Sequence, residues 1–479
     1  MKGVGLSRMF YTLEFELNVN FIFNTSHVIT ISSKEYKKMF PDELNVPETI
    51  HGFEIPKRKE RDSPFGYLLI DSTFELEEYD SLNEGAAKIR PQLLAIHGIL
   101  TFLTNKMFIS FQNFSSSFFM IKNHIKYSAK SPLLIFEGTN CSSDLDKIIK
   151  AISSSNYEKQ VLIYTLFERW RKALYLEVES EESYIHLDEA VLAYIHILEV
   201  LSDEFKKNLD AKIKLKRKEL ITEIIDWVTN SQIKNPKKIN TLLNLINANQ
   251  VTLKSKILQM LIDLNLYNLK SEAIILRFIE HRNSIAHGRK DIYQDKVVFP
   301  LKPFFSLIKD IDENPETIKV LSARAISSYL GLAAWNSEWK ETLLMEFTPL
   351  QLVKEFIESK RYMSISNNDF RKGKINGIIP LTISYYHLKN RISFQEMENV
   401  LSDIFLTSKS NKEICISLFN AAIPLSDSSS IELALKAREI IRKVDENDWG
   451  YYSNPRDFLK DYEYHGKYLK WFATWLTER

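Results

Sequence analysis

Apolar and polar residues alternate along the first part of the chain. Within residues 11–23, every second residue from 13 to 21 is apolar, and the residues between them are Glu or Asn. This period of two predicts a half-buried β-strand. Short runs rich in β-branched and aromatic residues predict further strands at residues 27–33, 65–78, 107–114, 117–125 and 131–138. A helical pattern in residues 86–105 is expected to start near Pro91 and to cover the sheet, so residues 1–150 are predicted to form an α+β, mainly β domain.

The apolar period then changes to that of helices. Residues 158–178 place their apolar side chains along one side, and residues 184–205 are apolar nearly all round, as in the central helix of a bundle. A basic linker region is predicted at residues 206–228. We therefore predict an all-helical bundle over residues 155–335. The helical region over 336–479 either continues this bundle or forms a separate domain.

Composition and charge narrow the class of protein. Of the 479 residues, 44% are hydrophobic and only 13 are Gly, which indicates a packed globular protein with room for about three domains. The 63 basic and 62 acidic residues nearly cancel, so any nucleic-acid surface must be a local patch. Cys141 and Cys415 suggest neither a zinc knuckle nor a disulfide framework. No secretory pattern and no run of about 18 apolar residues is present, so we expect a cytoplasmic protein without a membrane span.

The stretch RFIEHRNSIAHGRKD, residues 277–291, lies near the end of a predicted helix. Ser271 is the predicted N-cap, and Gly288 is expected to end the helix in a left-handed conformation. The apolar stripe of this helix consists of Ile274, Ile275, Phe278, Ile279 and Ile285. Asn283 and His287 are four residues apart on one face, and the long side chain of Arg282 reaches the same edge.

Arginine, asparagine and histidine suit the cleavage of RNA without a metal ion or a pair of carboxylates. A histidine with a pKa of about 6.5 exchanges a proton with the ribose 2′-OH or with the leaving 5′-oxygen. An arginine binds the phosphate in a fork and stabilises the charge of the transition state, while an asparagine orients either group. The nucleophile is the 2′-OH of the substrate itself, so the chemistry is specific to RNA.

The sequence HRNSIAHG resembles the R-x4-6-H motif of the HEPN superfamily, whose all-α members include many metal-independent ribonucleases. The resemblance covers residues 155–335, and the β-rich part before it is similar to the Apea-like branch of abortive-infection (anti-phage) proteins. It implies catalytic roles for Arg282, Asn283 and His287, and a homodimer in which two motif helices form one cleft. Some toxins of the family carry H-x-Y, but Arg289 stands at the tyrosine position here, so regulation by modification of that tyrosine is not expected.

Two hypotheses follow from these observations. In the first, the protein is a defence or toxin endoribonuclease that needs no metal and no cofactor, and its N-terminal domain senses a trigger, such as a phage-derived one, or inhibits the bundle. Arg289 and Lys290, directly after the motif, are then expected to bind RNA. In the second, the bundle is a non-catalytic module that binds RNA, a nucleotide or a protein, because Arg and His near a helix end are often surface residues that interact with the helix dipole.

Three further groups of residues have a structural and a functional interpretation. The basic run around Lys212, Lys214, Lys216, Arg217 and Lys218 is interpreted as a solvated helix face, with the binding of RNA phosphates as the alternative. His196 and Glu199 either support the site or are satisfied core groups. The aromatic stripe of Tyr464, Tyr468, Phe472 and Trp475 is interpreted as core, with base stacking or partner recognition as the alternative.

Overall fold

A computed structural model of the protein describes most of the chain. The described residues are 3–39, 49–50, 53–54, 65–77, 81–108, 114–122, 125, 127, 131–180, 186–230, 251–286, 315–449 and 455–478. The chain forms two compact units. The first comprises Met1–Tyr267, Ile275–Arg289 and Pro303–Lys340, and the second comprises Asn268–Ile274, Lys290–Lys302 and Glu341–Arg479.

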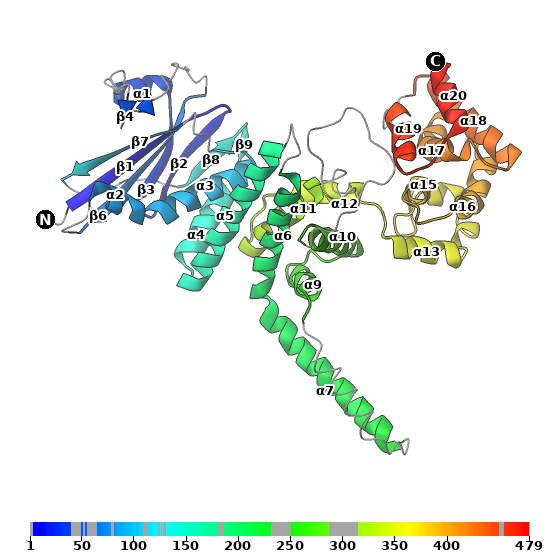
Figure 1. Ribbon diagram of the computed structural model, residues 1–479, viewed down its shortest axis with the longest axis horizontal. Coiled ribbons are helices and arrows are strands. Elements are labelled where there is room, and N and C mark those ends of the chain that lie inside the picture. The colour runs from blue at the N-terminus through cyan, green and yellow to red at the C-terminus, as the bar shows by residue number, and fades with distance from the viewer. Residues whose placement is uncertain are drawn as a thin grey trace. The chain divides into compact units, whose positions relative to one another are not determined.

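An antiparallel sheet forms the N-terminal part of the first unit (Figure 1). Among the described residues it has seven strands in the order β7-β1-β6-β3-β2-β8-β9. The strands are β1 (Gly3–Thr12), β2 (Leu17–Phe23), β3 (Ser26–Ile31), β6 (Tyr67–Leu76), β7 (Phe114–Ile121), β8 (Leu133–Phe136) and β9 (Thr139–Asn140). A separate pair joins β4 (Thr49–Ile50) to β5 (Phe53–Glu54). The predicted α+β character of this part is therefore confirmed.

The strand predicted across residues 13–21 is only partly correct. Its second half is β2, but residues 13–16 form a bend. The backbone N–H of Leu13 donates to the carbonyl of Gly66 at 3.1 Å, and the ring of Phe15 packs edge-on against Phe108 at 5.4 Å. The alternating apolar residues therefore lie partly in a packed turn and partly in a strand. The strands predicted at 27–33, 65–78 and 131–138 correspond to β3, β6 and β8, the run at 117–125 falls partly in β7, and most of 107–114 lies outside the described residues.

The helix predicted near Pro91 is α3 (Arg90–Thr104), with the proline in its first turn as expected. It packs on the face of the sheet that carries Tyr11, because the rings of Tyr11 and His97 lie 5.1 Å apart. Burial lowers the pKa of His97 to about 4. Short helices flank this region: α1 (Ser33–Met39), α2 (Leu82–Lys88) and α4 (Ser142–Ser153).

A helical bundle follows the sheet within the first unit (Figure 1). Its helices are α5 (Tyr157–Ser180), α6 (Leu187–Glu204), α7 (Lys206–Asn230), α9 (Leu253–Asp263), the greater part of α10 (Leu269–Ala286) and α11 (Pro315–Leu330). Trp170 is fully buried, and its ring contacts those of Phe102, Tyr194 and Trp335. The predicted central helix is observed as α6. The linker predicted at 206–228 is wrong, because this segment contains neither Gly nor Pro and belongs to the single helix α7.

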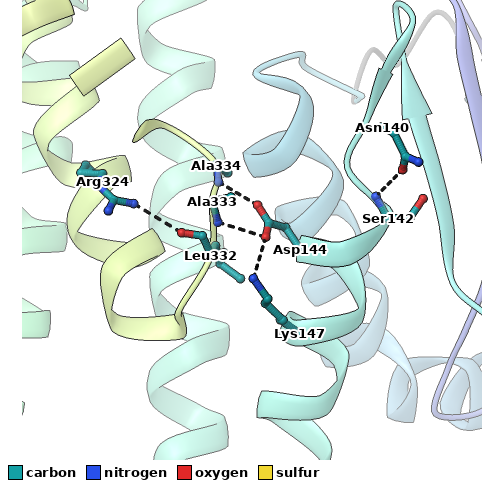
Figure 2. Close-up of polar contacts among 8 residues, drawn as sticks. All are labelled: Asn140, Ser142, Asp144, Lys147, Arg324, Leu332, Ala333 and Ala334. Atoms are coloured by element: carbon teal, nitrogen blue, oxygen red, sulfur yellow. Dashed lines mark hydrogen bonds and ion pairs between the residues drawn. The ribbon is translucent and has the colours of Figure 1, made fainter. Parts of the chain in front are cut away.

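Two polar clusters connect the helices of the first unit. In the first, the buried Lys319 of α11 lies 2.8 Å from a carboxylate oxygen of Glu177 in α5, and the hydroxyl of Tyr194 in α6 donates to the other oxygen. In the second, Asp144 of α4 holds the segment that follows α11, as Figure 2 shows. Its carboxylate accepts the backbone N–H groups of Ala333 at 3.0 Å and Ala334 at 2.7 Å.

The second unit is helical in its described part. Its helices include α13 (Leu350–Glu358), α14 (Asn367–Arg371), α15 (Pro380–Leu388), α16 (Phe394–Thr407), α17 (Lys412–Leu425), α18 (Ile431–Glu446), α19 (Pro455–Tyr464) and α20 (Lys470–Thr477), while α12 (Asn336–Met345) runs across the boundary between the units. The predicted aromatic core stripe is divided between α19 and α20, because Gly466 adopts a positive φ of 74° between them. Phe472 is buried, but Tyr468 is 65% exposed, so the core interpretation fails at that position. In the described part of the chain, no helix is long and apolar enough to cross a membrane.

Candidate active site

The helix α10 begins three residues earlier than the sequence predicts. The side-chain oxygen of Asn268 accepts the backbone N–H of Ser271 at 2.9 Å, and the Ser271 hydroxyl accepts the backbone N–H of Asn268 at 2.8 Å. This reciprocal pair satisfies donors at the start of the helix, so Asn268 caps it. The prediction of Ser271 as N-cap is therefore wrong, because Ser271 occupies the third helical position and supports the cap from inside.

The predicted apolar stripe of α10 is largely buried. Ile274, Ile275 and Phe278 are at most 3% exposed, while Ile279 and Ile285 are half-buried. His281 is also buried and packs its ring edge-on against Phe278 at 5.6 Å. Burial of this stripe fixes the rotation of α10 about its axis. The next residues, Arg282 and Asn283, consequently lie beside the buried stripe and are partly exposed.

Arg282 makes two hydrogen bonds that hold its guanidinium group. Its Nε donates to Oε1 of Glu199 at 3.2 Å, and its Nη1 donates to Oδ1 of the neighbouring Asn283 at 3.3 Å. Glu199 belongs to α6, so the ion pair joins the central helix of the bundle to α10. His196, one turn earlier on α6, has its Nε2 at 3.8 Å from Oε2 of Glu199. Glu199 is therefore a satisfied group whose partner is Arg282, a position compatible with both the structural and the functional interpretation.

The pair of Arg282 and Glu199 is neither buried nor freely solvated. The Arg282 side chain is 31% exposed and the Glu199 side chain is 22% exposed. Nε and Nη1 of the guanidinium group donate to Glu199 and Asn283, and Nη2 donates to no described residue. An arginine held in this way is oriented before it meets an anion, and Nη2 retains donors for a phosphate oxygen.

Three of the five predicted site residues lie outside the described residues: His287, Arg289 and Lys290. The predicted helix end at Gly288 also lies outside them. The structure thus brings together Arg282, Asn283, Glu199 and His196. Among the described residues, no group of three or more His, Cys, Asp or Glu side chains is placed to hold a metal ion.

The sequence does not show that Glu199 contacts Arg282, because the two residues are 83 positions apart. The available signal was the spacing of His196 and Glu199, which places two polar groups on one face of an otherwise apolar helix. Such a pair needs a polar partner from another helix, and the long side chain of Arg282 provides one.

Comparison with known proteins adds no relative. No protein-family model matches the chain, and no curated protein or solved structure matches it. The function of the site must therefore be inferred from its own residues.

Proposed function

We propose that the protein is a metal-independent endoribonuclease of defence or toxin type, with a HEPN-like bundle as its catalytic part. The supporting observation is the orientation of Arg282, which Glu199 and Asn283 hold at the partly exposed edge of α10. The sequence places His287 five residues further along, at the spacing of the R-x4-6-H motif. The two free cysteines, Cys141 and Cys415, are compatible with a reducing cytoplasm, where RNA is available.

Each residue of the motif has a defined role in this proposal. The guanidinium N–H groups of Arg282 that donate to no described residue bind a non-bridging phosphate oxygen and stabilise the charge that develops there. His287 exchanges a proton with the 2′-OH or with the leaving 5′-oxygen. The 2′-oxygen attacks the phosphorus and the bond to the 5′-oxygen breaks, so the products carry a 2′,3′-cyclic phosphate and a 5′-hydroxyl. Asn283 accepts a hydrogen bond from Nη1 of Arg282 and so orients the guanidinium group.

The proposal is tested with an RNA and a DNA of the same sequence in buffer that contains EDTA. The expected result is that the RNA is cut and the DNA remains intact, since only RNA carries the 2′-OH nucleophile. Cleavage of both strands, or cleavage of neither, would exclude the reaction. If the RNA binds but is not cut, the alternative of a non-catalytic RNA-binding module stands. The observation that favours this alternative is that Arg282 already has an acidic partner, as in an ordinary structural ion pair.

Glu199 is expected to act as a positioning residue for Arg282. Replacing Glu199 by Gln keeps the size of the side chain but removes the charge that holds the guanidinium, and we expect kcat to fall about tenfold with a smaller change in KM. Steady-state cleavage kinetics measure both constants. The matched control is Glu189→Gln, the same substitution at an exposed position of α6 ten residues before Glu199, which should leave kcat unchanged. Full activity of Glu199→Gln would show that the ion pair is only structural.

The proposed site is completed by a homodimer. A single copy of the motif supplies one arginine, Arg282, and one histidine, His287, whereas in-line cleavage needs an acid, a base and charge stabilisation, which two copies provide. Ile285 is half-buried and Ala286 is exposed, so small apolar groups are available at this end of the helix. We expect a mass in solution of twice 56.0 kDa, and partial recovery of activity when Arg282→Ala subunits are mixed with His287→Ala subunits. An active monomer would contradict the shared site.

A further inference from the structure

We infer that α7 is an arm that binds the phosphate backbone of RNA. Between positions 206 and 218 it carries seven basic residues and one acidic residue, although the whole chain has a net charge of +1. Phosphate contacts by lysine and arginine supply most of the sequence-independent affinity of a protein for nucleic acid. The choice of RNA among polyanions rests on the proposed function, whereas the binding surface follows from the charge and exposure of α7.

The first part of α7, up to Glu223, has no buried residue among the positions whose burial is described. Even the apolar side chain of Leu215 is 64% exposed. Figure 1 shows α7 extending away from the sheet and from α5 and α6. Within α7, Lys216 forms an ion pair with Glu219 at 2.7 Å. Closely spaced like charges destabilise a helix, so a polyanion that binds to them would stabilise α7.

One side of α7 is fixed to α9. The Nδ2 of Asn208 donates to a carboxylate oxygen of Asp263 at 3.0 Å, and the Nζ of Lys212 donates to Oε1 of Gln259 at 3.1 Å. At 3.6 residues per turn, Lys207 and Lys214 lie about 150° round the helix from Lys212 and about 10 Å apart along the axis. Both are exposed, and neither forms an ion pair with any described residue. Because no described residue pairs with these two lysines, they can contact successive phosphates.

The arm starts close to the proposed catalytic site. Lys206 follows Glu199 by seven residues, which corresponds to at most about 10 Å along a helix. Glu199 in turn holds Arg282. A strand of RNA that lies on the outer side of α7 could therefore reach Arg282 with its next few nucleotides. The arm would supply affinity without sequence preference, and the site would supply the chemistry.

The test measures binding separately from cleavage. A short single-stranded RNA with methylated 2′-hydroxyls cannot be cut by 2′-OH attack, so its fluorescence anisotropy reports binding alone. The variant Lys207→Gln/Lys214→Gln removes two exposed charges from the outer side, and Lys340→Gln/Lys412→Gln removes two exposed lysines elsewhere. We expect the first variant to bind about tenfold more weakly than wild type, with the slope of log K against log salt smaller by about 1.4. The control variant should bind as wild type does.

Each outcome decides between the claims. Equal affinity of the two double variants, or no RNA binding by the wild type, would overturn the inference about α7. Binding of α7 to vesicles of anionic lipid with no affinity for RNA would identify a membrane surface as its partner and would also overturn it. If the RNA binds through α7 but unmodified RNA is never cut, the inference about RNA binding by α7 is supported and the proposed ribonuclease function is excluded.

Discussion

Replacing Arg282 or His287 by alanine is expected to lower the rate of RNA cleavage by about 100- to 10,000-fold. Arg282→Ala removes the charge that stabilises the transition state, and His287→Ala removes the group that transfers the proton. The two effects should not add, because both residues serve the same step. Initial rates in buffer with EDTA, with the RNA at saturating concentration, measure the loss directly.

The matched control for this prediction is Arg277→Ala on the same helix. Arg277 lies over the ring of Phe278 at 5.4 Å, five positions before Arg282. Its removal should leave the cleavage rate within about a factor of two, since Arg277 lies about 140° round the helix from Arg282. A second variant, Arg282→Lys, keeps the charge but loses the fork that bonds Glu199 and Asn283. If Arg282→Ala cleaves as fast as Arg277→Ala, the motif has no catalytic role.

The local part of the site could be predicted from the sequence. The apolar period of α10 correctly predicts the burial of Ile274, Ile275 and Phe278, and this burial places Arg282 and Asn283 at an exposed edge. The cap at Asn268 was not predicted, because both Asn268 and Ser271 have the chemistry of an N-cap and the sequence does not show which backbone N–H groups are free.

The contacts between distant parts of the chain could not be predicted from the pattern of apolar and polar residues within single elements. The contact of Glu199 with Arg282 depends on how α6 and α10 pack, which no period within either helix specifies. The apolar residues alternate through the bend at residues 13–16 as they do in a strand, because Phe15 is packed within this turn. The segment 206–228, predicted as a basic linker region, is helical because its residues favour a helix and include neither Gly nor Pro.

The second large effect is expected at Lys319 in the bundle core. The Lys319 side chain is 6% exposed and lies 2.8 Å from Glu177, whose other oxygen accepts a hydrogen bond from the hydroxyl of Tyr194. Lys319→Ala leaves the carboxylate of Glu177 without its cation in a poorly solvated position, and we expect the free energy of unfolding to fall by about 3–5 kcal/mol. Urea titrations followed by tryptophan fluorescence measure this change.

A second lysine offers a control with the same geometry and different burial. Lys256 lies 2.8 Å from Asp203, but Asp203 is 61% exposed. Lys256→Ala should therefore change the free energy of unfolding by no more than about 1 kcal/mol. In Lys319→Met/Glu177→Leu, both charges are absent and most of the stability should return. Equal losses for Lys319→Ala and Lys256→Ala would mean that burial of the pair does not determine its contribution.

The most direct test of the proposed function is the chemistry of the RNA ends. RNA is incubated with the wild-type protein in EDTA, and the fragments are examined by mass spectrometry and by labelling with a kinase that requires a free 5′-hydroxyl. Attack by the 2′-OH predicts a 2′,3′-cyclic phosphate on one fragment and a 5′-hydroxyl on the other, with both lost in His287→Ala. Fragments with 5′-phosphate ends, or a strict requirement for added divalent ions, would contradict the mechanism, because such ends are typical of attack by metal-activated water.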